Sequence, residues 1–79
     1  MQSSAQDYPL AASTIERALR IEPGNPLLWI ELGRIRLRAG NAGQAAGLGR
    51  KALALATGDP GAQSAAQRLI ADSQHGGGR

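Results

Sequence analysis

Few side chains in this 79-residue sequence could perform acid–base or nucleophilic chemistry. Its single histidine, His75, lies in a glycine-rich tail, and there is no cysteine. Ser13, Ser64 and Ser73 have no base at a recognisable nucleophile–base spacing. Without thiolates or clustered imidazoles the chain also lacks the ligands of a structural metal site. We therefore predict a protein that is not an enzyme and that uses no cofactor.

The charge balance of the chain is basic, with 9 Lys and Arg against 6 Asp and Glu and a net charge of +3. A basic surface can attract nucleic acid by displacing phosphate counterions. Only 3% of the residues are aromatic, however, and the arginines are dispersed, which disfavours nucleic acid as the partner. No apolar run approaches the roughly 18 residues of a membrane span, so we expect a soluble chain.

Glycine-containing breaks divide the chain into segments with apolar residues at helical spacing. The breaks lie at residues 22–26, 39–41 and 57–60. Alanine is abundant and valine is absent, which favours helices over strands. We predict an all-α protein with antiparallel helices at about 8–22, 26–39, 42–56 and 60–73 in one domain spanning 7–73. Residues 1–6 and the glycine-rich tail 74–79 are expected to be disordered.

Residues with capping chemistry stand at the ends of the predicted helices. The predicted N-caps are Asp7, Asn25, Asn41 and Asp59. Gln44, three residues after Asn41, favours a capping box there, and proline follows the other caps within two residues. The predicted left-handed C-caps are Gly24, Gly40 and Gly58.

The sequence matches itself when it is offset by 34 residues. The matching pairs include Asp7 and Asn41, Ala11 and Ala45, Ala18 and Ala52, Leu19 and Leu53, Ile21 and Leu55, Gly24 and Gly58, and Pro26 and Pro60. A period of two helices is typical of solenoid repeats, whose helices bury their apolar faces against neighbouring repeats. The chain holds about two such repeats, so the pattern predicts an α-solenoid fragment.

The repeat resembles the tetratricopeptide repeat (TPR) family over about residues 7–73. The residues that carry the resemblance are Pro26, Trp29, Leu32, Gly33, Gly40, Asn41, Ala45, Ala52, Leu53 and Leu55. Gln63 and Gln67 occupy the tryptophan and glycine positions of a further repeat, so the last helix is expected to be a polar-faced cap. The resemblance implies a module that acts by protein–protein interaction.

The same resemblance implies a binding surface on the inner face of the array. The residues it places there are Leu27, Ile30, Arg34, Leu37 and Arg38, with Arg68 beside Arg34 because the two are one repeat apart. An apolar groove with two guanidinium groups suits an extended or helical partner segment that carries carboxylates. The Lys/Asn set of the carboxylate-clamp subgroup is missing, which argues against chaperone tails as the ligand.

Four further expectations concern contacts within and around the helices. Trp29 is predicted to be core, and Gly47 and Gly49 indicate close contact inside a helix, with Trp29 or the first helix as the bulky neighbour. Glu16 stands four residues before Arg20, a favourable spacing for a helical ion pair. The first repeat lacks its first helix, so Leu10, Ile15 or Leu19 could lack a covering neighbour, and self-association or a partner helix could cover that edge.

A narrower resemblance concerns two segments, residues 15–29 (IERALRIEPGNPLLW) and 37–41 (LRAGN). They are similar to the repeat domain of pseudomonad outer-membrane lipoproteins that activate the class A peptidoglycan synthase penicillin-binding protein 1b. This resemblance implies a location at the periplasmic face of the outer membrane, within a longer lipid-anchored protein. The alternatives are a generic TPR adaptor or scaffold in another assembly, and a basic helical domain that binds nucleic acid.

Overall fold

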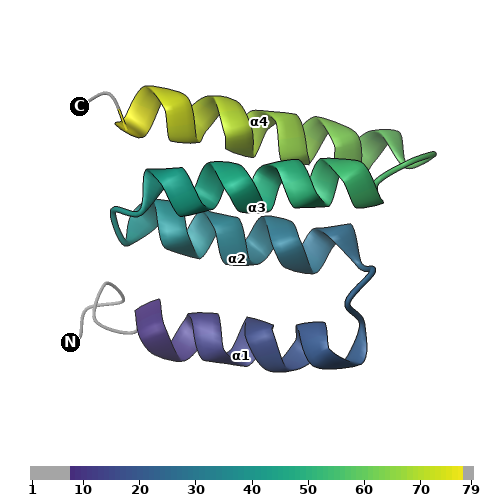
Figure 1. The fold of residues 1–79 in the computed structure, drawn as a ribbon, viewed down its shortest axis with the longest axis horizontal. Coiled ribbons are helices and arrows are strands. Elements are labelled where there is room, and N and C mark those ends of the chain that lie inside the picture. The colour runs from purple at the N-terminus through teal and green to yellow at the C-terminus, as the bar shows by residue number, and fades with distance from the viewer. Residues whose placement is uncertain (1–7, 78–79) are drawn as a thin grey trace.

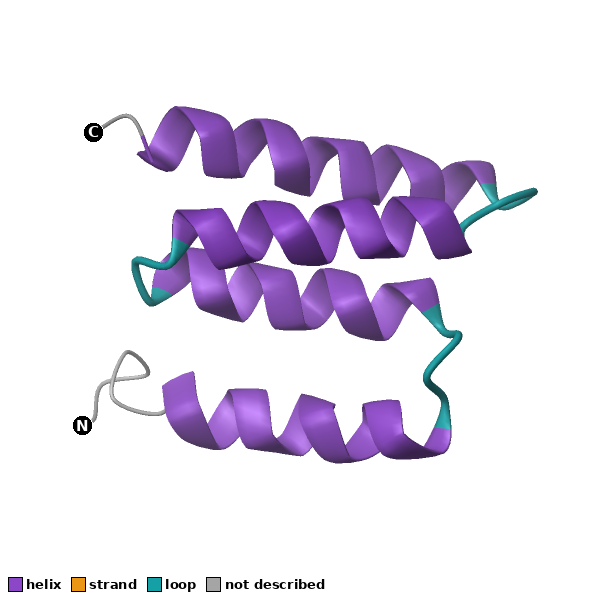
Figure 2. Ribbon diagram, viewed as in Figure 1, coloured by secondary structure: helices purple, strands orange, loops and turns teal. Residues whose placement is uncertain are grey.

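The computed structural model describes residues 8–77, and within this range all regular structure is α-helical, which confirms the predicted fold class. Helix α1 spans Tyr8–Ile21, α2 Pro26–Arg38, α3 Ala42–Leu55 and α4 Pro60–Gly77. Successive helices run antiparallel, with α2 and α3 between α1 and α4 (Figure 1). Short loops join them (Figure 2), as expected for stacked helical hairpins.

Two of the predicted N-caps start their helices as expected. The Asn25 Oδ1 accepts a hydrogen bond from the Leu27 N–H at 3.0 Å, and Pro26 occupies the first helical position of α2. The Asp59 Oδ1 accepts from the Ala62 N–H at 3.2 Å at the start of α4. Asp7, the third such prediction, lies outside the described residues.

Asn41 is the N-cap residue of α3, as predicted, but the predicted capping box is not formed, because the Asn41 side chain makes no capping hydrogen bond. Its backbone instead closes the preceding helix: the Asn41 N–H donates to the Arg36 carbonyl at 2.8 Å, and the Gly40 N–H donates to the Leu37 carbonyl at 3.1 Å. This pair of bonds is a Schellman motif. The end of α2 therefore fixes the orientation of Asn41 at the start of α3.

The glycine C-caps were predicted correctly in two of three places. Gly40 and Gly58 have φ of +93° and +80°, the left-handed conformation that glycine adopts at low cost. The prediction for Gly24 is wrong, because its φ is not positive. There the chain makes a turn closed by the Asn25 N–H, which donates to the Glu22 carbonyl at 3.2 Å.

Helix α4 continues to Gly77 instead of ending at residue 73, so the tail predicted to begin at residue 74 contributes the last helical turn. Ser73, the predicted end, is buried, and its hydroxyl donates to the Ile70 carbonyl at 2.7 Å. No proline follows it to stop the helix. The first three helices end within one residue of their predicted bounds.

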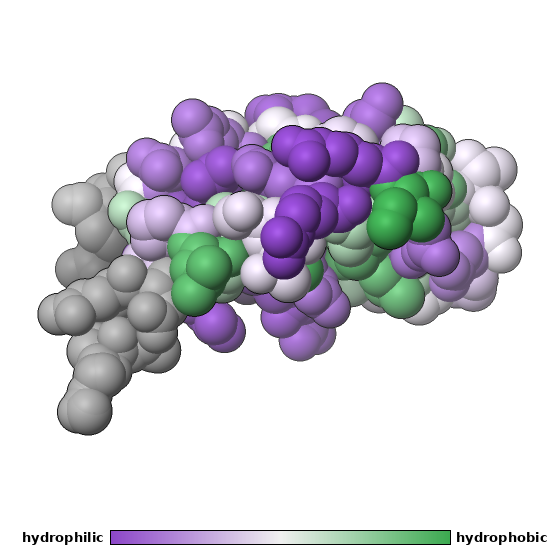
Figure 3. Space-filling model, turned by 90° about the horizontal axis from the view of Figure 1, so that it is seen from below, coloured by the Kyte–Doolittle hydropathy of each residue, from purple (hydrophilic) through white to green (hydrophobic). Residues whose placement is uncertain are grey.

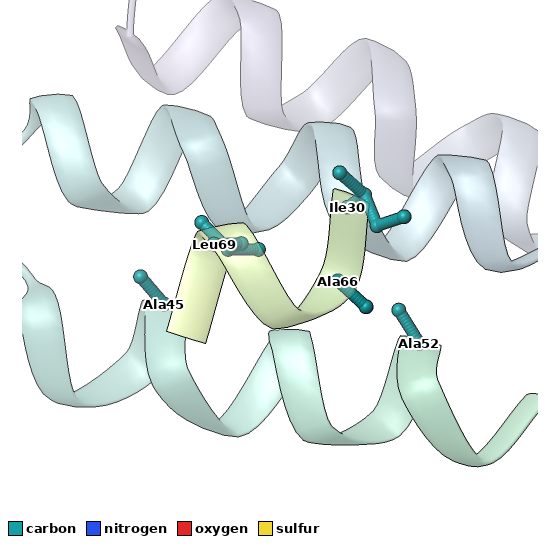
Figure 4. Close-up of a cluster of buried hydrophobic side chains, with 5 residues drawn as sticks. All are labelled: Ile30, Ala45, Ala52, Ala66 and Leu69. Carbon is teal, nitrogen blue, oxygen red and sulfur yellow. The ribbon is translucent and has the colours of Figure 1, made fainter. Parts of the chain in front are cut away.

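The core is built mainly from alanine and leucine at the contacts between helices. Its larger cluster joins α2, α3 and α4 (Figure 4) and consists of Ile30, Ala45, Ala52, Ala66 and Leu69. The smaller cluster joins α1 to α2 and consists of Ala12, Leu19 and Leu32. Trp29 packs against both clusters, and its Nε1 donates to the Pro23 carbonyl at 2.8 Å. Trp29 therefore packs on the core as predicted, although its side chain is only partly buried.

Glycine allows close helix contact at two positions. A Cβ on Gly33 would collide with Leu69 of α4, and one on Gly49 would lie 2.7 Å from the Ile70 Cγ1. Gly47, in contrast, has open space around its Cα. The predicted close contact is therefore confirmed for Gly49 alone, and its bulky neighbour is Ile70 rather than Trp29 or the first helix.

Candidate partner-binding groove

A groove of about 460 Å³ runs along one side of α2 and reaches α4. It is lined by Leu27, Ile30, Glu31, Arg34, Ile35, Arg38 and Ala65. Leu27, Glu31, Arg34 and Arg38 are spaced by four, three and four residues, so α2 presents them as one stripe. Leu27 is 53% exposed, which leaves an uncovered apolar side chain at one end of the groove.

A smaller hollow of about 220 Å³ adjoins this groove. Its walls are Arg34, Ser64, Ala65 and Arg68, so the two hollows share Arg34 and Ala65. The 34-residue repeat explains the arrangement, since α4 presents Ala65 and Arg68 where α2 presents Glu31 and Arg34. Arg34 and Arg68 therefore lie side by side, as the repeat predicts.

The structure brings five of the six predicted site residues to these two hollows. Leu27, Arg34 and Arg38 line the groove, Ile30 is buried beneath it, and Arg68 lines the smaller hollow. Leu37 does not line either of them. It packs against the larger core cluster instead, because it lies off the stripe that Arg34 and Arg38 share.

Sequence reasoning missed three lining residues, namely Glu31, Ile35 and Ala65. Helical spacing could have found Glu31, which lies four residues after Leu27 and three before Arg34. The repeat then leads to Ala65, which is 34 residues after Glu31. Glu31 matters for the electrostatics, since it sets one carboxylate among the arginines of the groove.

The arginines of the two hollows lie exposed and free of ion pairs within the described residues. The ion pair among the described residues lies outside the two hollows. It joins the Arg36 Nη2 to the Glu16 Oε2 at 3.0 Å and links α2 to α1. Glu16 therefore pairs with Arg36, and the predicted pair with Arg20 is wrong. Arg36 faces away from Arg34 and Arg38, as expected from helical spacing. Arg34, Arg38 and Arg68 remain available to an external anion.

A further hollow, of about 400 Å³, lies on the opposite side of α2 from the groove. Its walls come from α1, α2 and α3, and consist of Glu16, Leu32, Arg36, Gln44, Gly47 and Leu48. The ion pair between Glu16 and Arg36 stands at this hollow, so its charges are mutually compensated. The missing side chain of Gly47 contributes to its width.

The described residues offer no metal-binding group of three or more His, Asp or Glu side chains. No described helix is both long and apolar enough to cross a membrane. His75 is exposed, and the Ser73 hydroxyl is engaged with a backbone carbonyl. The groups that line the two hollows are apolar side chains, guanidinium groups, the Ser64 hydroxyl and the Glu31 carboxylate.

Antiparallel helical pairs with a 34-residue internal repeat are the architecture of an α-solenoid. The family model described as "Tetratricopeptide repeat" matches residues 3–72, and the chain belongs to that family. Comparison with curated proteins and with solved structures gave no match. Tetratricopeptide repeats are typically non-enzymatic modules of protein–protein interaction.

Proposed function

We propose that the chain binds a partner protein through the groove between α2 and α4, and that the bound segment carries both apolar and carboxylate side chains. The observation that carries this proposal is that Arg34 and Arg68 line the same hollow. Neither has a carboxylate partner among the described residues. Guanidinium groups form charge-assisted hydrogen bonds with carboxylates, frequently in bidentate geometry.

The shape of the site supports a segment that uses both hollows. An apolar side chain of the partner would cover Leu27 and lie over Ile30 and Ile35 in the groove. A carboxylate would lie between Arg34 and Arg68 in the smaller hollow. Because Glu31 repels a second carboxylate at the groove, a single acidic residue beside an apolar one fits better than an acidic run.

The finer proposal is that the partner is a class A peptidoglycan synthase, penicillin-binding protein 1b. The chain would then be the periplasmic domain of an outer-membrane lipoprotein that activates this enzyme. Support comes from the resemblance of segments 15–29 and 37–41 to the repeat domain of such lipoproteins. These segments include Leu27 and Arg38 of the groove.

Activation sets a thermodynamic condition on this complex. Binding shifts an enzyme toward its active conformation only when the module has a higher affinity for that conformation than for the inactive one. The binding free energy and the stimulation are therefore coupled, and a substitution in the groove should reduce both together.

The test is a binding and stimulation assay with the purified synthase. We expect saturable binding and an increased rate of glycan synthesis. Arg34→Glu or Arg68→Glu should reduce both the affinity and the stimulation at least tenfold. Arg20→Glu makes the same charge change on α1, outside both hollows, and should leave binding unchanged. No binding at about 50 μM together with an unchanged rate would reject the synthase as partner.

The generic adaptor and the nucleic-acid alternatives are separated by two further measurements. If a different protein binds and the same two substitutions weaken its binding, the groove is kept as the binding site and the synthase is rejected as the partner. Titration with duplex and single-stranded oligonucleotides tests the remaining alternative. Tight binding with a steep salt dependence would favour nucleic acid over a protein segment.

A further inference from the structure

The 34-residue repeat relates whole helices to one another, with α1 corresponding to α3 and α2 to α4. Helix α3 packs against α2 on one side and against α4 on the other. Helix α1 packs mainly against α2 (Figure 1). In the repeat, this contact corresponds to the contact between α3 and α4. Among the described residues, no helix occupies the position beside α1 that corresponds to α2 beside α3.

The face of α3 that meets α2 identifies the corresponding face of α1. A Cβ on Gly33 of α2 would lie 3.4 Å from both the Ala45 carbonyl oxygen and the Leu48 Cβ, so these residues of α3 face α2. Ala52 lies on the same stripe, in one cluster with Ile30. Subtracting 34 from these positions gives Ala11, Thr14 and Ala18 of α1. Ile21, three residues after Ala18, continues the same stripe, and these four residues form the open face of α1.

The exposure of these residues shows how much of this face a helix placed there would cover. Ala45 and Ala52 of α3 are 0% exposed, whereas their counterparts Ala11 and Ala18 are only half-buried. Ile21 is 81% exposed. Figure 3 views the molecule from the side of α1 and shows hydrophobic surface toward both ends of that side. Small residues beside an uncovered isoleucine form a surface on which a helix can pack closely.

Helix α2 shows which kind of helix fits such a face. Its Trp29 contacts both core clusters, and the Lys51 Nζ of α3 lies 5.5 Å from the centroid of the Trp29 ring. Gly33, four residues later, allows the backbones to approach. Arg17 is the counterpart of Lys51 on α1 and is exposed, so it could take the same position over an aromatic ring.

A second copy of the chain does not offer this chemistry. The helix with an open outer side at the other end of the array is α4, where Gln63 and Gln67 replace Trp29 and Gly33. Gln67 is exposed and polar, and neither glutamine supplies an aromatic ring or room for a close approach. Head-to-tail association of two copies would bury these amides against the apolar part of α1, at a cost in free energy.

We propose that the open face of α1 binds an amphipathic helix of a partner protein, with an aromatic residue followed four positions later by glycine or alanine. This surface is separate from the groove of α2 and α4 and gives the module a second docking site. The bound helix would lie on α1 as α2 lies on α3.

A fluorescently labelled peptide with the sequence of residues 25–41 is a suitable probe, because it contains the helix that fits α3. Its binding to the full chain is measured by fluorescence anisotropy. The matched control peptide carries Trp29→Gln and Gly33→Gln, the residues found in α4. We expect saturable binding of the first peptide and at least tenfold weaker binding of the control.

Variants of the chain locate the binding. Thr14→Glu and Ile21→Glu change exposed residues of the open face and should each weaken binding of the peptide at least tenfold. Ser13→Glu introduces the same residue on another side of α1 and should leave binding unchanged. Circular dichroism checks that all three variants keep their helix content, and Arg34→Glu should have no effect on this peptide.

Three outcomes would overturn the proposal. They are no binding at about 100 μM peptide, equal binding of the two peptides, and equal loss in Ser13→Glu and Ile21→Glu. Sedimentation of the chain alone adds a separate criterion. A dimer that Ile21→Glu dissociates would assign the open face to a second copy instead of a partner helix.

Discussion

Gly49 of α3 lies so close to Ile70 of α4 that an added Cβ would approach the Ile70 Cγ1 to 2.7 Å. The same Cβ would lie 3.4 Å from the Ala66 carbonyl oxygen. Helices α3 and α4 therefore owe their close spacing to the absence of one side chain. Gly47, two residues earlier in the same helix, has nothing within 4 Å of such a Cβ.

This contrast predicts opposite effects for the same substitution. Gly49→Ala should lower the free energy of unfolding by about 1 kcal/mol, because overpacking outweighs the gain in helix propensity. Gly47→Ala should raise it by up to about 1 kcal/mol, since only the propensity changes. Urea denaturation followed by circular dichroism measures both. Stabilisation by both substitutions would contradict the close contact.

The ion pair between Glu16 and Arg36 is expected to contribute little to stability, because both side chains are partly exposed. Glu16→Gln should lower the free energy of unfolding by less than about 1 kcal/mol at low salt. The loss should shrink at high salt, where the pair is screened. Glu31→Gln serves as the control, since Glu31 forms no ion pair within the described residues. An equal, salt-independent loss in both variants would exclude a role for the pair.

Leu69 is the largest fully buried side chain among the described residues and contacts both α2 and α3. Leu69→Ala should cost about 2 to 5 kcal/mol, which is a large part of the total stability expected for a domain of this size. Leu10→Ala makes the same change at a side chain that is 67% exposed and should cost less than about 0.5 kcal/mol. Thermal unfolding of the two variants compares them directly. Similar midpoints would contradict the assigned core.

Binding in the groove should depend on salt if the guanidinium groups of Arg34 and Arg68 contact a carboxylate. The affinity for the partner is expected to fall as ionic strength rises, because exposed charge pairs are screened. In the double variant Arg34→Gln/Arg68→Gln, binding should be weaker and its salt dependence flatter. Isothermal titration at two salt concentrations gives both quantities. An unaltered salt dependence in the variant would place the acidic contact elsewhere.

The sequence predicted those features that depend on local signals and on the repeat. Asn25 and Asp59 could be predicted as caps because each is followed directly by proline at a sharp change of pattern, and the side-chain oxygen of each accepts a helix N–H. The proximity of Arg34 and Arg68 follows from the 34-residue period. Such features need no knowledge of how the helices pack.

The features that could not be predicted depend on contacts between helices or on competition for one backbone group. The four-residue spacing suggests Arg20 as the ion-pair partner of Glu16. The packing of α1 on α2 brings Arg36 to Glu16 instead, and this contact is not visible in the sequence. Asn41 carries a capping side chain, but its backbone is held by the end of α2. The TPR resemblance places Leu37 in the groove, but Leu37 lies off the stripe of Arg34 and Arg38 and packs against the larger core cluster.

The position of α1 at the end of the array, packed mainly on α2, also has a dynamic consequence. Protection of amide protons against exchange should be lowest in α1 and highest in α3, because α1 can detach without disrupting the larger core cluster. Such an opening would break one ion pair and expose Leu32. The native ensemble would then contain a minor three-helix species, and a helix bound beside α1 would be seen as slower exchange in α1 itself.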